Sequence, residues 1–167
     1  MGSLALDANI TGSNNTALGY AALSGNTVSG NTAVGSDALV VNTTGASNVA
    51  VGVNALDVNT TGNYNTAMGY DALGANITAH RLTAIGYEAL KASAVSGNSN
   101  ASNTAVGFHA GLATTTGTAN VFIGSQCGDA NTTGSQNTAV GLGSLGQNTT
   151  ADNNTAVGFV ALTANTT

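Results

Sequence analysis

Few side chains in this sequence are capable of nucleophilic chemistry: one cysteine, Cys127, and two histidines, His80 and His109. A cysteine nucleophile needs a nearby base, a third group that orients the base, and a pocket for the substrate. Cys127 instead occupies a position that alanine or serine fills in the other copies of a repeat. It is therefore interpreted as a buried substitute for alanine, and the chain is not predicted to be an enzyme.

Charged side chains concentrate in one part of the chain, where they are placed to contact another molecule. His80, Arg81, Glu88 and Lys91 all lie between residues 80 and 91. Asp71 and Glu88 stand at the same position of successive repeats, and two such carboxylates are a candidate cation site. Exposed ion pairs are worth only about 0–1 kcal/mol, so solvated ion pairs are the simpler interpretation. No metal or organic cofactor is predicted.

Aromatic residues recur directly after a glycine of the repeat. This column predicts packing in the core or against a neighbouring chain, with stacking on sugar rings as the alternative. Its members are Tyr20, Tyr70, Tyr87, Phe108 and Phe159. Together with the charged group, it gives the candidate surface-contact residues His80, Arg81, Glu88, Lys91, Tyr70 and Tyr87.

The composition excludes several classes of function. The net charge is −5 and the fixed cations are Arg81 and Lys91, so a basic nucleic-acid-binding surface is excluded. No apolar run approaches the ~20 residues that cross a bilayer, so membrane insertion is not expected. A single cysteine excludes an internal disulfide framework. The residues that follow Met1 lack the pattern of a signal peptide.

Copies of one repeat account for nearly the whole chain. Each reads Asn-Thr-Ala, then an aliphatic residue or methionine, then Gly, followed later by Ala-Leu and Asn-Thr-Thr-Gly, and most copies are spaced by 17 residues. We predict a single repeat array over 1–167 of about nine and a half coils, with a longer coil at 82–102. The array starts and stops within a repeat, which suggests part of a longer array. The copies begin at Asn15, Asn31, Asn48, Asn65, Leu82, Asn103, Asn120, Asn137 and Asn154.

A repeat of 17 residues is too short for two helices and suits one coil of an all-β, parallel β-solenoid. Each coil is predicted to hold two short strands and two turns, with Asn-Thr-Thr-Gly as turn sequence. Alternate residues of a strand share a face, so threonine and valine point one way and the alanine between them points the other. We expect the alanine column to face a neighbouring chain, because a flat alanine strip is an unusual surface for solvent.

Leucine and asparagine form further columns. The leucine column is interrupted at Gly111 and Gly128, where Leu112 is expected to substitute one position later. Stacked asparagines are predicted to form amide ladders from coil to coil. A thin coil buries little apolar surface, and this favours an oligomer.

The strings Asn-Val-Ala-Val-Gly at 48–52 and Leu-Thr-Ala-Ile-Gly at 82–86 resemble the Ser-Val-Ala-Ile-Gly core of YadA-like head repeats. These repeats occur in trimeric autotransporter adhesins, and the chain looks still closer to related repeats of bacteriophage tail-fibre proteins. The resemblance extends over 5–167. It implies a left-handed parallel β-roll and a homotrimer of intertwined or side-by-side chains.

Three functions follow from this pattern. The leading hypothesis is a structural or adhesive fibre segment of a phage tail fibre or bacterial surface adhesin, located in the virion or at the cell surface, with a cell-surface glycan as partner. A second is ice binding through paired threonines, and a third is a filament subunit that assembles end to end. The threonine pairs are Thr43-Thr44, Thr60-Thr61, Thr132-Thr133, Thr149-Thr150 and Thr166-Thr167.

Overall fold

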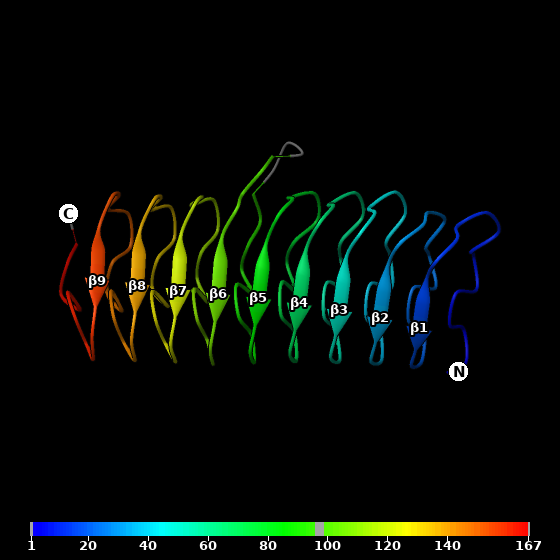
Figure 1. Ribbon diagram of the computed structural model, residues 1–167, viewed down its shortest axis with the longest axis horizontal. Helices are drawn as coiled ribbons and strands as arrows, with labels where there is room; N and C mark the ends of the chain where they lie inside the picture. Colours follow the sequence, from blue (N-terminus) through cyan, green and yellow to red (C-terminus); the bar gives the residue numbers. More distant parts are fainter. Residues whose placement is uncertain (1, 96–98, 167) are drawn as a thin grey trace.

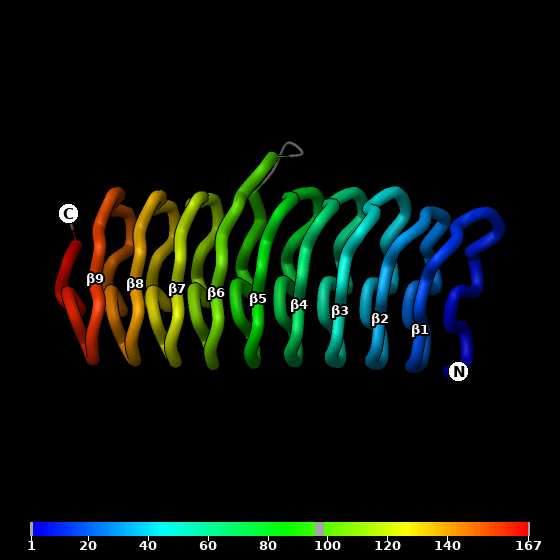
Figure 2. The backbone as a smooth tube through the Cα atoms, viewed as in Figure 1, coloured from blue at the N-terminus to red at the C-terminus, as the bar shows by residue number. Residues whose placement is uncertain are grey.

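The computed structural model describes residues 2–95 and 99–166 and shows an elongated rod with the two ends of the chain at opposite ends (Figures 1 and 2). Nine strands of three residues form one parallel sheet in the order β1 to β9. The predicted all-β, parallel β-solenoid is confirmed. The strands are β1 (Thr16–Leu18), β2 (Thr32–Val34), β3 (Val49–Val51), β4 (Thr66–Met68), β5 (Thr83–Ile85), β6 (Thr104–Val106), β7 (Val121–Ile123), β8 (Thr138–Val140) and β9 (Thr155–Val157).

The strands pair in the register that the repeat predicts. Ala50 of β3 lies opposite Ala67 of β4, and Ala67 lies opposite Ala84 of β5. Equivalent residues of successive copies therefore stack along the rod. Each column of the repeat, read in the sequence, corresponds to a physical row of side chains.

Each coil contains one strand, and the prediction of a second strand is wrong. The Ala-Leu segment forms a turn in which leucine has a positive φ, as at Leu39 (52°) and Leu56 (53°). This left-handed conformation costs an L-residue about 1–2 kcal/mol and cannot continue a strand. It is held by the next coil, because the Leu39 N–H donates to Ala55 O and the Leu56 N–H to Ala72 O, both at 3.1 Å.

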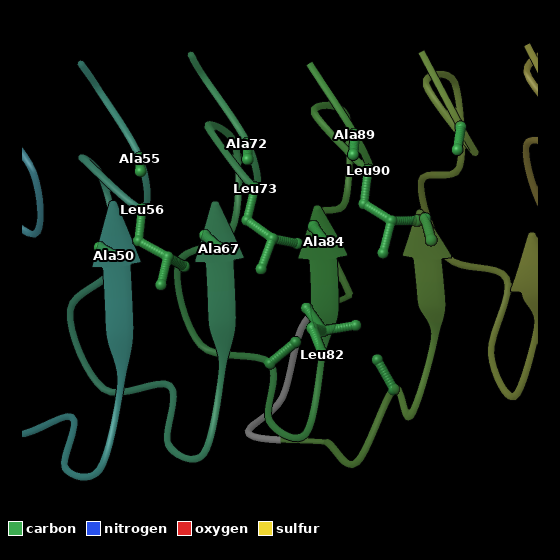
Figure 3. Packing of buried hydrophobic residues seen from close by; sticks show 14 of the residues in the cluster. Ala50, Ala55, Leu56, Ala67, Ala72, Leu73, Leu82, Ala84, Ala89 and Leu90 are labelled. Carbon is green, nitrogen blue, oxygen red and sulfur yellow. The ribbon is translucent and has the colours of Figure 1, made fainter. Parts of the chain in front are cut away.

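The alanine column faces the interior, so the expectation that it faces a neighbouring chain is wrong. Ala50, Ala67 and Ala84 are fully buried, whereas the residues that flank them in the strands are partly exposed. Figure 3 shows Leu56 and Leu73 lying between these alanines. The leucine of the turn fills most of the narrow interior, which leaves room for only a methyl group from the strand.

A compensating set of substitutions appears where the leucine column is interrupted. Phe122 of β7 replaces the strand alanine and is fully buried. Its ring occupies the space that side chains at Gly111 and Gly128 would need, since an added Cβ at Gly111 would lie 2.8 Å from Phe122 Cδ2. The expected substitution by Leu112 is wrong. Phe122 supplies the missing core volume instead, and Leu112 is only partly buried.

Two asparagine columns run through the rod, as predicted. In one, the Asn48 backbone N–H donates to Asn31 Oδ1 of the preceding coil at 2.8 Å. In the other, side-chain amides bond directly, as from Asn59 Nδ2 to Asn42 Oδ1 at 2.9 Å and from Asn76 Nδ2 to Asn59 Oδ1 at 3.0 Å. These asparagines are fully buried, so the amides are committed to holding one coil on the next.

The longer coil lies between β5 and β6, where the chain leaves the outline of the rod (Figure 1). Its base is still bonded to the neighbouring coil, because the Ala94 N–H donates to Thr115 O at 3.0 Å and the His80 N–H donates to Ser99 O at 3.0 Å. Val95 and Ala101 are buried. Within the predicted longer coil at 82–102, residues 96–98 lie outside the described residues.

Candidate functional site

Four charged or ionisable side chains from three successive coils meet on the surface beside β4, β5 and β6. Lys91 Nζ lies 2.9 Å from Asp71 Oδ2 and 2.8 Å from Glu88 Oε1. His109 Nε2 faces Glu88 Oε2 at 3.1 Å, although its geometry is not that of an aligned hydrogen bond. We call Asp71, Glu88, Lys91 and His109 the charged cluster. Its cation offsets the repulsion between two carboxylates that the repeat stacks one above the other.

The ion pairs shift the pKa values in the directions expected for charge neutralisation. The hydrogen bond from Lys91 lowers the pKa of Glu88, and hydrogen bonds to Glu88 and Asp71 raise the pKa of Lys91. Two nearby carboxyls shift the other way, because burial raises the pKa of Asp57 and of Asp129. Lys91 is thus charged at neutral pH, where the carboxylates are ionised as well.

The aromatic rings next to the charged cluster stack on one another along the rod. The ring centroids of Tyr70 and Tyr87 are 5.2 Å apart and those of Tyr87 and Phe108 are 5.5 Å apart, with interplanar angles of 12° and 17°. The His109 ring lies 3.8 Å from that of Phe108. We call Tyr70, Tyr87 and Phe108 the aromatic stack. Because the facing surfaces of the rings cover one another, stacking of a sugar between them is disfavoured.

A shallow hollow of about 500 Å³ adjoins the charged cluster. Its walls are mainly small apolar side chains, with Asp71 and Lys91 at its edge. A side chain at Gly74 would collide with the Asp71 carboxylate. The remaining lining residues are Gly74, Ala75, Ala92, Leu112 and Ala113.

The structure brings together four of the six candidate contact residues, Tyr70, Tyr87, Glu88 and Lys91, and places His80 and Arg81 elsewhere. His80 is only 8% exposed, and its Nδ1 accepts a hydrogen bond from the Asn63 backbone N–H at 2.8 Å. In other coils, the hydroxyl oxygens of Ser29 and Ser135 accept the equivalent hydrogen bond from a backbone N–H of the preceding coil. His80 therefore bonds one coil to the next.

Arg81 is exposed and forms no ion pair with any described residue. Its backbone N–H donates to Asn63 O at 3.1 Å, and its φ of 60° places it at a corner of the coil. The corner directs its charged side chain to solvent. Arg81 thus remains a separate surface cation.

Cys127 is fully buried, as predicted, and its thiol lies 3.2 Å from Ala139 O. Burial raises the pKa of Cys127 to about 11, so the thiolate needed for nucleophilic attack is scarce at neutral pH. The residue occupies the alanine column of the turn and packs in the core.

Two members of the charged cluster, Asp71 and His109, were absent from the predicted contact set. Both stand in the same column of the repeat as Glu88. Their side chains are largely buried, with exposures of 17% and 24%. The repeat column was a sufficient signal that these side chains lie near one another. It did not show that Lys91, which stands outside the column, would form ion pairs with both Asp71 and Glu88.

Within residues 2–95 and 99–166, no group of three or more His, Cys, Asp or Glu side chains is arranged to hold a metal ion. No long apolar helix capable of crossing a membrane occurs in the same residues. Comparisons with protein-family models, curated proteins and solved structures found no match.

An apolar strip runs along the outward surface of the sheet. It consists of two neighbouring columns, the last residue of each strand and the residue after the following glycine. Met68, Tyr70, Ile85, Tyr87 and Phe108 are between 37% and 47% exposed. The remaining members are Leu18, Tyr20, Val34, Ser36, Val51, Val53, Val106, Ile123, Ser125, Val140, Leu142, Val157 and Phe159.

Proposed function

We propose that this chain is a rigid structural segment of an extracellular fibre, in a phage tail fibre or a bacterial surface adhesin, and that it assembles side by side with copies of itself. The observation that carries the proposal is the apolar strip, which extends over all nine strands and contains no charged residue. Apolar patches larger than a few hundred Å² are rarely left exposed and usually mark an interaction surface. A rod with an apolar strip along its outward sheet face is suited to lateral packing.

The proposed number of three chains rests on the resemblance to trimeric adhesin and tail-fibre repeats. Nine strands spaced by ~4.8 Å, with a strip roughly 10 Å wide, give about 400 Å² per chain. Two chains that meet through this strip would bury about 800 Å² in total, which is in the range of weak interfaces, and a third chain leaves the area buried per chain unchanged. The same resemblance implies a left-handed roll.

The mechanical role rests on the bonding between coils. Backbone hydrogen bonds and buried asparagine ladders join each coil to the next, so bending the rod would strain many bonds together. The same surface positions recur every coil, at about 4.8 Å, and can make many weak contacts with a repetitive partner such as a cell-surface glycan. Glu88 and Lys91 form one candidate surface for such contacts, and Arg81 forms another.

Ice binding by the paired threonines is a weaker alternative. The first hydroxyl is already used between coils in three of the five pairs, since Thr43 Oγ1 donates to Thr60 O at 3.1 Å, Thr60 Oγ1 to Ile77 O at 3.2 Å and Thr132 Oγ1 to Thr149 O at 2.9 Å. Fewer free donors then face an ice surface. The pair at 166–167 lies partly outside the described residues. Thermal hysteresis of the purified protein would revive this alternative.

The native mass of the protein tests the proposed assembly. We expect light scattering to give three times the chain mass of 16.1 kDa, with short rods in electron microscopy of the same sample. A monomer at micromolar concentration would refute side-by-side assembly. Long filaments would instead favour the end-to-end alternative, in which exposed strand edges pair.

A further inference from the structure

The apolar strip carries one feature that does not follow the repeat. The residue after the glycine is aromatic in the coils of β1, β4, β5, β6 and β9, and it is serine, valine or leucine in the coils of β2, β3, β7 and β8. The last residue of each strand, in contrast, is aliphatic or methionine in every coil. Aromatic bulk therefore varies along the rod while the rest of the strip stays nearly uniform.

A uniform strip cannot fix how two parallel rods align along their length. Because equivalent residues recur at every coil, a slip of one coil keeps eight of the nine strand levels overlapped. The same kind of degeneracy lets strands slip in register when their faces are too regular. An assembly of such rods needs an irregular feature at the contact if it is to have one alignment.

The aromatic positions supply that feature. Aromatic residues follow β1, β4, β5, β6 and β9. In an in-register pair of chains, each of these five aromatic residues lies beside an aromatic residue of the partner. After a slip of one coil only two do, when the coil of β4 lies beside that of β5 and the coil of β5 beside that of β6. A slip of two coils matches one, and a slip of three matches two. We propose that the aromatic column, centred on the Tyr70–Tyr87–Phe108 stack, sets the axial register of neighbouring copies of this chain.

The aromatic stack is built to present a fixed shape to such a partner. Its three rings are nearly parallel, and about 44–47% of each residue remains exposed. The His109 ring packs on Phe108 at 3.8 Å, and Glu88 lies beside His109, so the charged cluster supports one side of the stack. A second copy of the chain is the occupant that fits, because its coils have the same spacing along the full strip.

The register role rests on the proposed side-by-side assembly and is tested separately from it by cross-linking. In a Cys127→Ala background, one population of chains carries Ser125→Cys and another carries Leu142→Cys, which is the same position one coil further along. After mixed refolding, disulfide formation is expected mainly between like chains. Mixed disulfides report a slip of one coil.

The decisive variant replaces Tyr70, Tyr87 and Phe108 together by valine, the residue that Val53 provides at this position. This change keeps the strip apolar and the fold compatible, while it removes three of the five aromatic levels. The ratio of mixed to like disulfides is expected to rise several-fold. Tyr64→Ser is the control, because Tyr64 is exposed in another column, where Ser47 occupies the preceding coil; it should leave the ratio unchanged.

Each outcome has a distinct meaning. A triple valine variant that assembles with an unchanged disulfide ratio would overturn the register role while the assembly stands. A triple variant that no longer assembles would also overturn it and make the rings a source of affinity. Chains that carry the introduced cysteine and keep Tyr70, Tyr87 and Phe108, but form no intermolecular disulfide at either position, would overturn the side-by-side assembly itself.

Discussion

Lys91 is the residue on which the charged cluster depends, because it neutralises two carboxylates at once. Replacing it, as Lys91→Met, leaves Asp71 and Glu88 stacked without a cation. We expect a loss of about 1 kcal/mol of unfolding free energy near neutral pH, a modest value because Lys91 is 41% exposed and solvent screens its charge. Urea denaturation measures this change, and Arg81→Met, which removes an unpaired surface cation, is the control.

The same ion pairs predict how the effect of Lys91→Met varies with pH. The pKa of Glu88 is lowered in the folded state, so its stabilisation is present above the unfolded-state pKa of about 4.3 and is lost as the pH falls through the folded-state value. The pKa of Lys91 is raised, so its stabilisation persists up to about pH 10. The variant should therefore match the parent protein near pH 2. An equal loss at both pH values would show that Lys91 acts through packing of its aliphatic stem.

At the scale of the element, the coil around β7 shows that core volume is conserved although its residues change. Phe122→Ala restores the usual strand residue but leaves a cavity, because Gly111 and Gly128 have no side chains to fill it. A loss of about 3–5 kcal/mol is expected. Adding Gly111→Leu and Gly128→Leu to Phe122→Ala should recover most of it.

These leucines are compatible with the backbone, since the glycines have φ of 61° and 59° and the leucines of the same column have φ of 49–57°. The free energy of unfolding of the single and triple variants gives the coupling between the sites. A neutral Phe122→Ala, or a triple variant less stable than the single one, would show that loss of core volume is not the main cause of the destabilisation.

The coil also shows which structural features the sequence predicts and which it does not. Spacing alone located the columns, the parallel register and the asparagine ladders, because identical positions must stack in a solenoid. It did not predict which face of the strand is internal, since alternation defines two faces without ranking them. The left-handed corners of the coil decide which face is internal, and Leu56 and Glu88 adopt this conformation although leucine and glutamate rarely have a positive φ. The contact of Lys91 with two coils depends on those same corners.

For the whole molecule, stacking of coils that contact only their neighbours predicts that the rod tolerates removal of one complete unit. Deleting residues 31–47 removes the coil of β2 and joins Gly30 to Asn48, which begins the next copy. All columns then remain in phase. We expect a folded rod that is shorter by ~4.8 Å, measured as a reduced maximum dimension in small-angle scattering.

A deletion of half a coil is the matched control for that experiment. Removing residues 31–38 joins Gly30 to Leu39 and places every later column out of phase with the first coil. Asparagine would then meet leucine across the joint, and buried amides would lose their partners at a cost of about 1–3 kcal/mol each. This variant should unfold or aggregate. If the complete-coil deletion unfolded as well, the stability of the rod would have to come from interactions longer in range than neighbouring coils.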